Sequence, residues 1–280
     1  MKKTTIFLLG ASFVLLASCV PTYFYQTYTV VPVEKDVVKN NVITYEDANC
    51  KIYYNFWDEG GNIGFEFYNK LEENIYLNLD QCFFIFNGLA HDYYKNRIYT
   101  HSSSTGTMAT RSAYFSVAAS GKNNQNLDQT NKTVLGGMAG QSVSSGYSVS
   151  SAEEKTICIP PKTSKIISEY LINQELYRDC DLFKYPTKKQ VQSKSFSQND
   201  SPMKFSNRLT YQVDGQNEAI VFVNEFFVSE ITNYPYSMFF EKEYPEFCEQ
   251  KGSSMQTYFT KSSPDKFYIQ YSKGVDSWKH

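Results

Sequence analysis

The sequence predicts a mainly β protein, a two-layer sandwich that is interrupted by one long Ser/Gly-rich insertion and carries at most one or two short helices. Aromatic residues make up 16% of the 280 residues, with 23 Tyr and 21 Phe, and this bias favours strands over helices. Apolar residues also recur at every second position in several runs, which stand both before and after the insertion. Strands on both sides of a flexible segment indicate two sheets packed in one domain.

The first clear strands are expected from Cys50 onward. Apolar residues alternate with more polar ones over 50–56 and again over 63–67, and the turn sequence Asp58-Glu59-Gly60-Gly61-Asn62 lies between them. This pattern predicts a hairpin with one apolar face. Period two continues over 75–79, and the unbroken apolar run 82–86 predicts a strand that is buried on both faces.

The composition changes sharply at His101. From there to Ser151 the chain consists mainly of Ser, Gly, Thr, Asn and Gln, so we expect insertion 101–151 to be flexible and to take part in binding. Further strands are predicted over 208–213, 219–232 and 267–271. The best candidate for a helix is SEYLINQELYR (168–178), with Ser168 as its N-cap.

The amino-terminal stretch predicts where the protein resides. Lys2 and Lys3 precede an apolar run (6–16) that is too short to span a bilayer, as in a secretory signal peptide. The next residues, Leu16-Ala17-Ser18-Cys19, resemble the lipobox of bacterial lipoproteins. This resemblance implies cleavage before Cys19, a diacylglycerol on its sulfur and an acylated new amino terminus. We therefore expect a membrane-anchored protein outside the cytoplasm.

These observations divide the chain into three parts. Residues 1–18 form the signal peptide, 19–41 the lipid anchor and tether, and 42–280 a single β-sandwich domain with the flexible insertion 101–151. Within the tether, residues 28–33 could equally add an edge strand. The residue after the cysteine is Val20 and not Asp, and no acidic run follows Cys19. This resembles lipoproteins of the outer membrane that face the periplasm.

The charge balance argues against one class of partner. Removal of the signal peptide leaves 262 residues with 25 basic and 29 acidic side chains, a net charge near −4, and no block of like charge. Proteins that bind nucleic acid or anionic lipid normally carry a basic stripe. We therefore expect no nucleic-acid partner.

The cysteines predict disulfides but not their pairing. With Cys19 lipidated, an odd number remains for an oxidising compartment, so at least one thiol must stay free or pair between molecules. Two structural disulfides and one buried thiol are expected. The possible disulfide cysteines are Cys50, Cys82, Cys158, Cys180 and Cys248.

Four stretches resemble a known group of proteins. The run 69–88, which ends in Asn87-Gly88, and Ile159-Pro160-Pro161-Lys162 are similar to immunoglobulin-like domains of small bacterial lipoproteins. Ser201-Pro202-Met203-Lys204-Phe205 and residues 226–231 (FFVSEI) are similar to stretches in uncharacterised Bacteroidetes envelope lipoproteins. The likeness lies in turns and strands, so it implies an immunoglobulin-like sandwich at the cell envelope and no activity.

Catalytic signals are weak throughout the sequence. The three histidines form no metal-binding spacing, no Walker loop or dinucleotide fingerprint is present, and Gly140-Gln141-Ser142-Val143-Ser144 lacks the second glycine of a nucleophile elbow. We expect no catalytic residue, metal or cofactor. Surplus aromatic residues could form a platform for a glycan or peptide. The candidates are Tyr53, Trp57, Tyr68, Tyr93 and Tyr94.

The sequence thus predicts a non-enzymatic, lipid-anchored envelope protein that binds or scaffolds an envelope partner. Two alternatives stay open. One is a glycan- or peptide-binding accessory lipoprotein of a larger assembly, which a row of exposed aromatic side chains would favour. The other is a hydrolase with dispersed acidic residues, which converging carboxylates in a deep pocket would favour.

Overall fold

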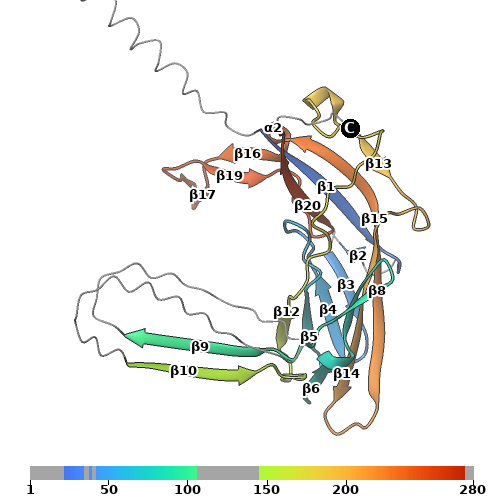
Figure 1. The fold of residues 1–280 in the computed structure, drawn as a ribbon, viewed down its shortest axis with the longest axis vertical. Helices are drawn as coiled ribbons and strands as arrows, with labels where there is room; N and C mark the ends of the chain where they lie inside the picture. Colours follow the sequence, from blue (N-terminus) through green and yellow to red (C-terminus); the bar gives the residue numbers. More distant parts are fainter. Residues whose placement is uncertain (1–21, 35–37, 40–41, 106–144, 275–280) are drawn as a thin grey trace, which may run out of the picture.

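The computed structural model describes residues 22–34, 38–39, 42–105 and 145–274, and these ranges are mainly β, as the sequence predicts. Two antiparallel sheets form the body, and together they curve into about half of a barrel (Figure 1). Cys19 and the expected signal peptide lie outside the described residues.

The larger sheet has nine strands. Its main path runs through β11 (Thr156–Ile159), β6 (Ile75–Asn78), β14 (Lys204–Val213), β15 (Ala219–Pro235), β1 (Tyr23–Pro32) and β20 (Lys266–Ser272). The remaining strands branch from this path as β13 (Ser193–Ser195) beside β15, β7 (Phe83–Phe86) beside β14 and β8 (Leu89–Asp92) beside β7. With 17 residues, β15 reaches from one end of the sheet to the other.

The smaller sheet has five strands, and it confirms the predicted hairpin. Its order is β12 (Ser164–Ile167), β5 (Phe65–Asn69), β4 (Cys50–Tyr54), β3 (Val42–Glu46) and β2 (Val38–Lys39). Alternate residues of β4 and β5 are buried, as the period-two pattern requires, and Ile52 pairs with Phe67.

Aromatic rings from the two sheets meet in one core. Tyr54 of β4 lies 5.0 Å from Phe226 of β15, and Phe67 of β5 lies 5.6 Å from Tyr211 of β14, measured between ring centroids. Both pairs meet edge to face, the arrangement that the quadrupoles of two rings prefer. The bias towards Tyr and Phe in the composition therefore reflects how the core is built.

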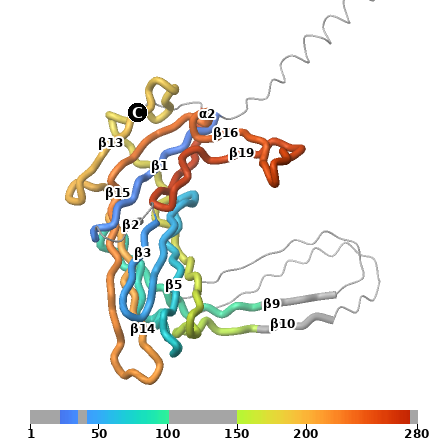
Figure 2. Tube along the Cα trace, turned by 180° about the vertical axis from the view of Figure 1, so that it is seen from behind, coloured from blue at the N-terminus to red at the C-terminus, as the bar shows by residue number. Residues whose placement is uncertain are grey.

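Two hairpins project from the same side of the body (Figures 1 and 2). One consists of β9 (Ile98–Thr105) and β10 (Ser145–Ala152), and the other of β16 (Phe240–Glu243) and β19 (Gln256–Phe259), with β17 (Glu246–Phe247) and β18 (Gln250–Lys251) at its tip. At the root of the first hairpin Arg97 donates to Glu153 at 2.5 Å and to Glu169 at 2.6 Å. Burial is the largest single influence and raises the pKa of both glutamates, but the hydrogen bonds and charges of Arg97 and Lys95 together outweigh it, so both pKa values are lowered.

The described residues contain little helix. There is one α-helix, α2 (Tyr236–Phe239), and there are two 3-10 helices, η3 (Leu79–Gln81) and η4 (Lys188–Gln190). No helix in these ranges has the length and apolar character needed to cross a membrane. Residues 83–86 of the apolar run become β7, where Phe84 is buried and the other three residues are half-buried, so the prediction of burial on both faces is wrong.

The predicted tether is wrong for residues 23–32, because they form β1 between β15 and β20, so the alternative of a strand within 28–33 is confirmed although the strand is not an edge strand. Seven of its ten residues are buried. The sequence of β1 shows no alternation of apolar and polar residues, because polar residues of this strand are buried as well as apolar ones. Gln26 is only 1% exposed, and its partners lie 151 and 207 positions away in the sequence.

The predicted helix at 168–178 is also absent. Two backbone donors in its middle bond outside the segment, since the N–H of Ile172 donates to the carbonyl of Gly61 at 2.8 Å and that of Asn173 to the carbonyl of Gly60 at 2.9 Å. The two glycines have φ of +81° and +75°, and a Cβ on Gly61 would lie 2.7 Å from the ring of Phe267. The segment is therefore held extended across the glycine turn.

The predicted insertion 101–151 can be judged only at its ends. Residues 106–144 lie outside the described residues. At the ends β9 and β10 pair over eight residues each, from Ile98 with Ala152 to Thr105 with Ser145. The expectation of an unstructured chain from His101 to Ser151 is therefore wrong at both ends.

The position of β1 predicts a large difference between two of its tyrosines. Tyr28 is fully buried and stacks on Phe267 at 4.5 Å, whereas Tyr23 is 36% exposed at the start of the strand. We expect Tyr28→Ala to lower the free energy of unfolding by roughly 3–5 kcal/mol, the usual cost of removing a buried ring. Tyr23→Ala should cost less than about 1 kcal/mol. Urea denaturation measures both, and equal small losses would show that residues 23–32 act as a tether.

Candidate functional site

The structure disperses the five candidate aromatic residues. Tyr53 and Tyr68 share the outer face of the smaller sheet, on neighbouring strands β4 and β5. Trp57 instead packs against Phe239, Phe259 and Tyr268 below the second hairpin, which leaves it half-buried. The five therefore form no single row.

The other two candidates have roles within the structure. Tyr94 donates to Asn96 at 2.8 Å and lies under the ammonium of Lys155. Tyr93 is 2% exposed, so its selection as a binding residue is wrong. The sequence placed it next to Tyr94, but the ring turns into the core, where its hydroxyl finds a partner.

Tyr93 begins a chain of hydrogen bonds through the core. Its hydroxyl donates to Oδ1 of Asn207 at 2.8 Å, and Nδ2 of Asn207 donates to the hydroxyl of Tyr54 at 3.3 Å. That hydroxyl in turn donates to Oδ1 of Asn224 at 2.8 Å. All four residues are buried, and they come from both sheets and the connection after β8. We name them the polar chain.

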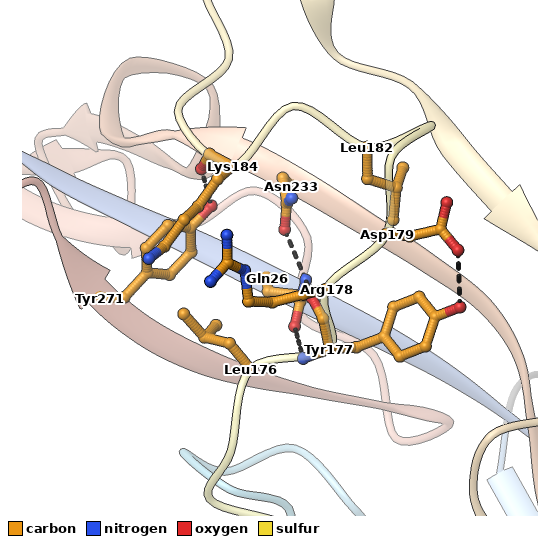
Figure 3. A pocket seen from close by; sticks show the side chains of 9 residues that line it. All are labelled: Gln26, Leu176, Tyr177, Arg178, Asp179, Leu182, Lys184, Asn233 and Tyr271. Carbon is orange, nitrogen blue, oxygen red and sulfur yellow. Dashed lines mark hydrogen bonds between the residues drawn. The ribbon is translucent and has the colours of Figure 1, made fainter. Parts of the chain in front are cut away.

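A second polar cluster ties a long connection to the larger sheet (Figure 3). The side-chain amide of Gln26 donates to the carbonyl of Tyr177 at 2.9 Å and to Oδ1 of Asn233 at 2.8 Å, while its oxygen accepts from the N–H of Tyr177 at 2.8 Å. Asn233 also donates to the carbonyl of Phe183 at 3.0 Å.

This cluster leaves no room for a ligand. The cavity beside Gln26 has a volume of about 10 Å³, which is space for one water molecule. Its side chains are committed to one another, and Asp179 at the rim is held by Lys194 at 2.5 Å, which lowers the pKa of that carboxyl to about 2. The cluster therefore fixes residues 176–185 on the sheet.

A larger hollow opens between the two sheets. Its volume is about 360 Å³, within the range of small-ligand sites. One wall comes from β3 and β4 and the other from the first half of β15. We call it the seam groove, and its lining residues are Glu34, Tyr45, Glu46, Asp47, Cys50, Ile52, Ile220, Phe222, Val223 and Asn224.

Tyr45 is the unusual residue of the seam groove. It is 8% exposed, and its hydroxyl is buried without a hydrogen-bond partner among the described residues. Every other buried side-chain N or O atom in those residues has one. Burial raises the pKa of Tyr45, and the charges of Glu34 and Glu225 raise it further, so the phenol stays protonated and can donate a hydrogen bond.

The rim of the seam groove is acidic. Glu46 is paired with Lys70 at 2.6 Å and Lys51 at 3.3 Å, and Asp47 accepts from Tyr211 at 2.5 Å. Glu34 and Glu225 are exposed and make no ion pair within the described part of the chain. Two carboxylates beside the groove thus have no ion-pair partner in the part of the chain that the structure describes.

Metal ligands do not gather in the described ranges. No three side chains of His, Cys, Asp or Glu come together there as a metal site would require. His91 stacks on Phe84 of β7 at 5.8 Å and lies as far from Tyr170, so it belongs to an aromatic cluster.

The cysteines form no disulfide among the described residues, so the expectation of two bridges is wrong for this structure. Cys50 and Cys82 are buried in the core, Cys158 is half-buried, and Cys180 and Cys248 are exposed. The number of cysteines in a sequence does not show which of them lie close together, and here the five thiols lie on separate segments of the chain. Burial raises the pKa of Cys82 to about 11 and that of Cys50 further still.

No protein-family model matches this chain, and no curated protein and no solved structure matches it either. Its function must therefore be inferred from its own residues.

The thiols should react in two classes. At pH 8 a thiol with a pKa of about 11 is almost entirely protonated and unreactive, so Cys82 and Cys50 should resist alkylation in the folded protein. Cys180 and Cys248 should be labelled first. Mass spectrometry after unfolding without reductant should find all five labelled. A pair of cysteines that is labelled only after reduction would show that the two form a disulfide, contrary to this prediction.

The unpartnered hydroxyl predicts that one substitution stabilises the protein. Tyr45→Phe removes a buried polar group that has no partner, so the free energy of unfolding should rise by roughly 1 kcal/mol, about 2–4 °C in Tm. The matched control is Tyr54→Phe, which breaks the polar chain and should cost roughly 1–3 kcal/mol. Differential scanning calorimetry distinguishes them. A loss of stability in both variants would mean that Tyr45 is satisfied in the folded protein.

Proposed function

We propose that this chain is a lipid-anchored binding protein of the cell envelope that holds a partner in the seam groove. The hydroxyl of Tyr45 is the observation that carries the proposal. A buried polar group without a partner costs stability, so a ligand towards which Tyr45 turns its covered hydroxyl recovers that cost on binding. The groove also has the volume and the largely apolar lining that are typical of binding sites.

The proposed location rests on the lipobox. Cleavage before Cys19 and lipid on its sulfur would hold the protein at a membrane, and Val20 favours the outer membrane with the body in the periplasm. We also propose that the fold is an immunoglobulin-like sandwich. Two antiparallel sheets that face each other across one aromatic core support that classification.

The alternative of a glycan platform has less support than the groove. A platform needs exposed rings side by side, and only Tyr53 and Tyr68 among the five candidates share a face. A peptide or protein segment suits the groove better, because the two walls are apolar and the rim is acidic.

A photo-crosslinking experiment in cells tests the proposal. Val223 lies at the groove and is 45% exposed, so p-benzoylphenylalanine at this position should give one discrete adduct in the membrane fraction. The Cys19→Ser form should move to the soluble fraction while it remains folded. The matched control is the same crosslinker at Ile166, which is 78% exposed on β12 of the other sheet and should give no adduct.

Two results would contradict the proposal, one for each half. If Cys19→Ser stays in the membrane fraction, the proposal of a lipid anchor on Cys19 is wrong. Equal adducts at Val223 and Ile166, or none at either, remove the groove as the binding site.

A further inference from the structure

Within the described residues, one edge of β15 is unpaired beside the seam groove. From Ala219 to Asn224 this strand pairs with β14 on one side, and β1 reaches its other side only from Phe226 onward. Among the described residues no strand covers the edge of β15 between these points. Its six residues are about as long as an ordinary strand.

The backbone groups of this edge can be assigned. The carbonyl of Glu225 accepts from the N–H of Val33, so the backbone of Glu225 faces the side of β1. Because N–H and C=O groups alternate between the two sides of a strand, those of Val223 and Val221 face the same side. Neither residue can bond to β14 with these groups.

The edge also lacks the usual protection against pairing. Exposed edges normally carry lysine, proline or a bulge that prevents another strand from adding. Residues 219–224 (AIVFVN) contain none of these, and Val221 and Val223 are nearly half exposed. A chain that adds here would also lie over the groove, with alternate side chains directed towards Tyr45.

Charge specifies the partner further. Glu225 lies next to the open edge and Glu34 lies on the groove rim, and neither carboxylate is paired within the described residues. An acidic or neutral segment would leave both uncompensated, whereas lysine or arginine side chains would pair with them.

We infer that the seam groove binds an extended basic segment of a partner protein, which adds as an antiparallel strand to Ala219–Asn224 of β15. This inference rests on the proposed binding function and names its partner class. The added backbone bonds Val221 and Val223, Tyr45 turns its covered hydroxyl to bond an inward side chain, and outward lysines or arginines face Glu34 and Glu225. Backbone pairing supplies affinity, and the hydroxyl and the two carboxylates supply selectivity.

Fluorescence anisotropy with a labelled heptapeptide tests the inference on the full chain purified in detergent. The probe is KVKQKVK, which presents alternate lysines on one face and a central glutamine on the other. Saturable binding is expected. It should weaken at least tenfold in Val223→Pro, which removes one N–H of the open edge, and less than threefold in Val223→Thr, which keeps it. The double variant Glu34→Gln with Glu225→Gln should also bind at least tenfold more weakly.

The acidic peptide EVEQEVE and a KVKQKVK that is N-methylated at alternate residues serve as competitors, and neither should displace the probe. Absence of saturable binding, or equal binding to Val223→Pro and Val223→Thr, overturns the inference. If Val223 gives an adduct in cells but the heptapeptide does not bind, the groove remains a binding site and a basic strand is rejected as its occupant. Failure of both experiments rejects the binding function itself.

Discussion

The polar chain from Tyr93 to Asn224 is the constraint on which the rest of the core depends. It joins β4 to β14 and β15 in the middle of an apolar core, where each unpaired group would be costly. Hydrophobic contact alone tolerates sliding of one sheet over the other, but four buried hydrogen-bonding groups fix the relative position. Asn224 is also a wall of the seam groove, so the same chain fixes the geometry of the site.

The contrast between Tyr54 and Tyr45 follows from this arrangement. Both side chains point between the sheets, and their rings lie 6.0 Å apart. Tyr54 donates to Asn224 of β15, whereas the hydroxyl of Tyr45 has no hydrogen-bond partner among the described residues. Tyr54 is therefore a core residue, whereas Tyr45, whose hydroxyl lacks a hydrogen-bond partner, is the proposed binding residue.

Local patterns predicted those parts of the fold that depend on neighbours in sequence. The hairpin of β4 and β5 was predictable, because alternation over residues 50–67 and a Gly-Gly turn require only short-range pairing. β1 was not, since Gln26 becomes acceptable in a core only through Tyr177 and Asn233. The helix at 168–178 failed for a related reason, because Gly60 and Gly61 offer acceptors that the sequence places more than a hundred positions earlier. Tyr45 gave no signal at all, because an unpartnered hydroxyl is a property of the folded surroundings.

The position of β1 near the amino terminus has a consequence for the orientation of the body. With lipid on Cys19 as proposed, four residue steps separate the anchor from Tyr23, and even a fully extended chain spans no more than about 14 Å over that length. The end of the larger sheet where Tyr23 pairs with Ser272 must then stay next to the bilayer. A link of this length keeps the body close to the membrane. It limits how far the strands can reorient, so each feature of the body stays within a narrow range of distances from the lipid.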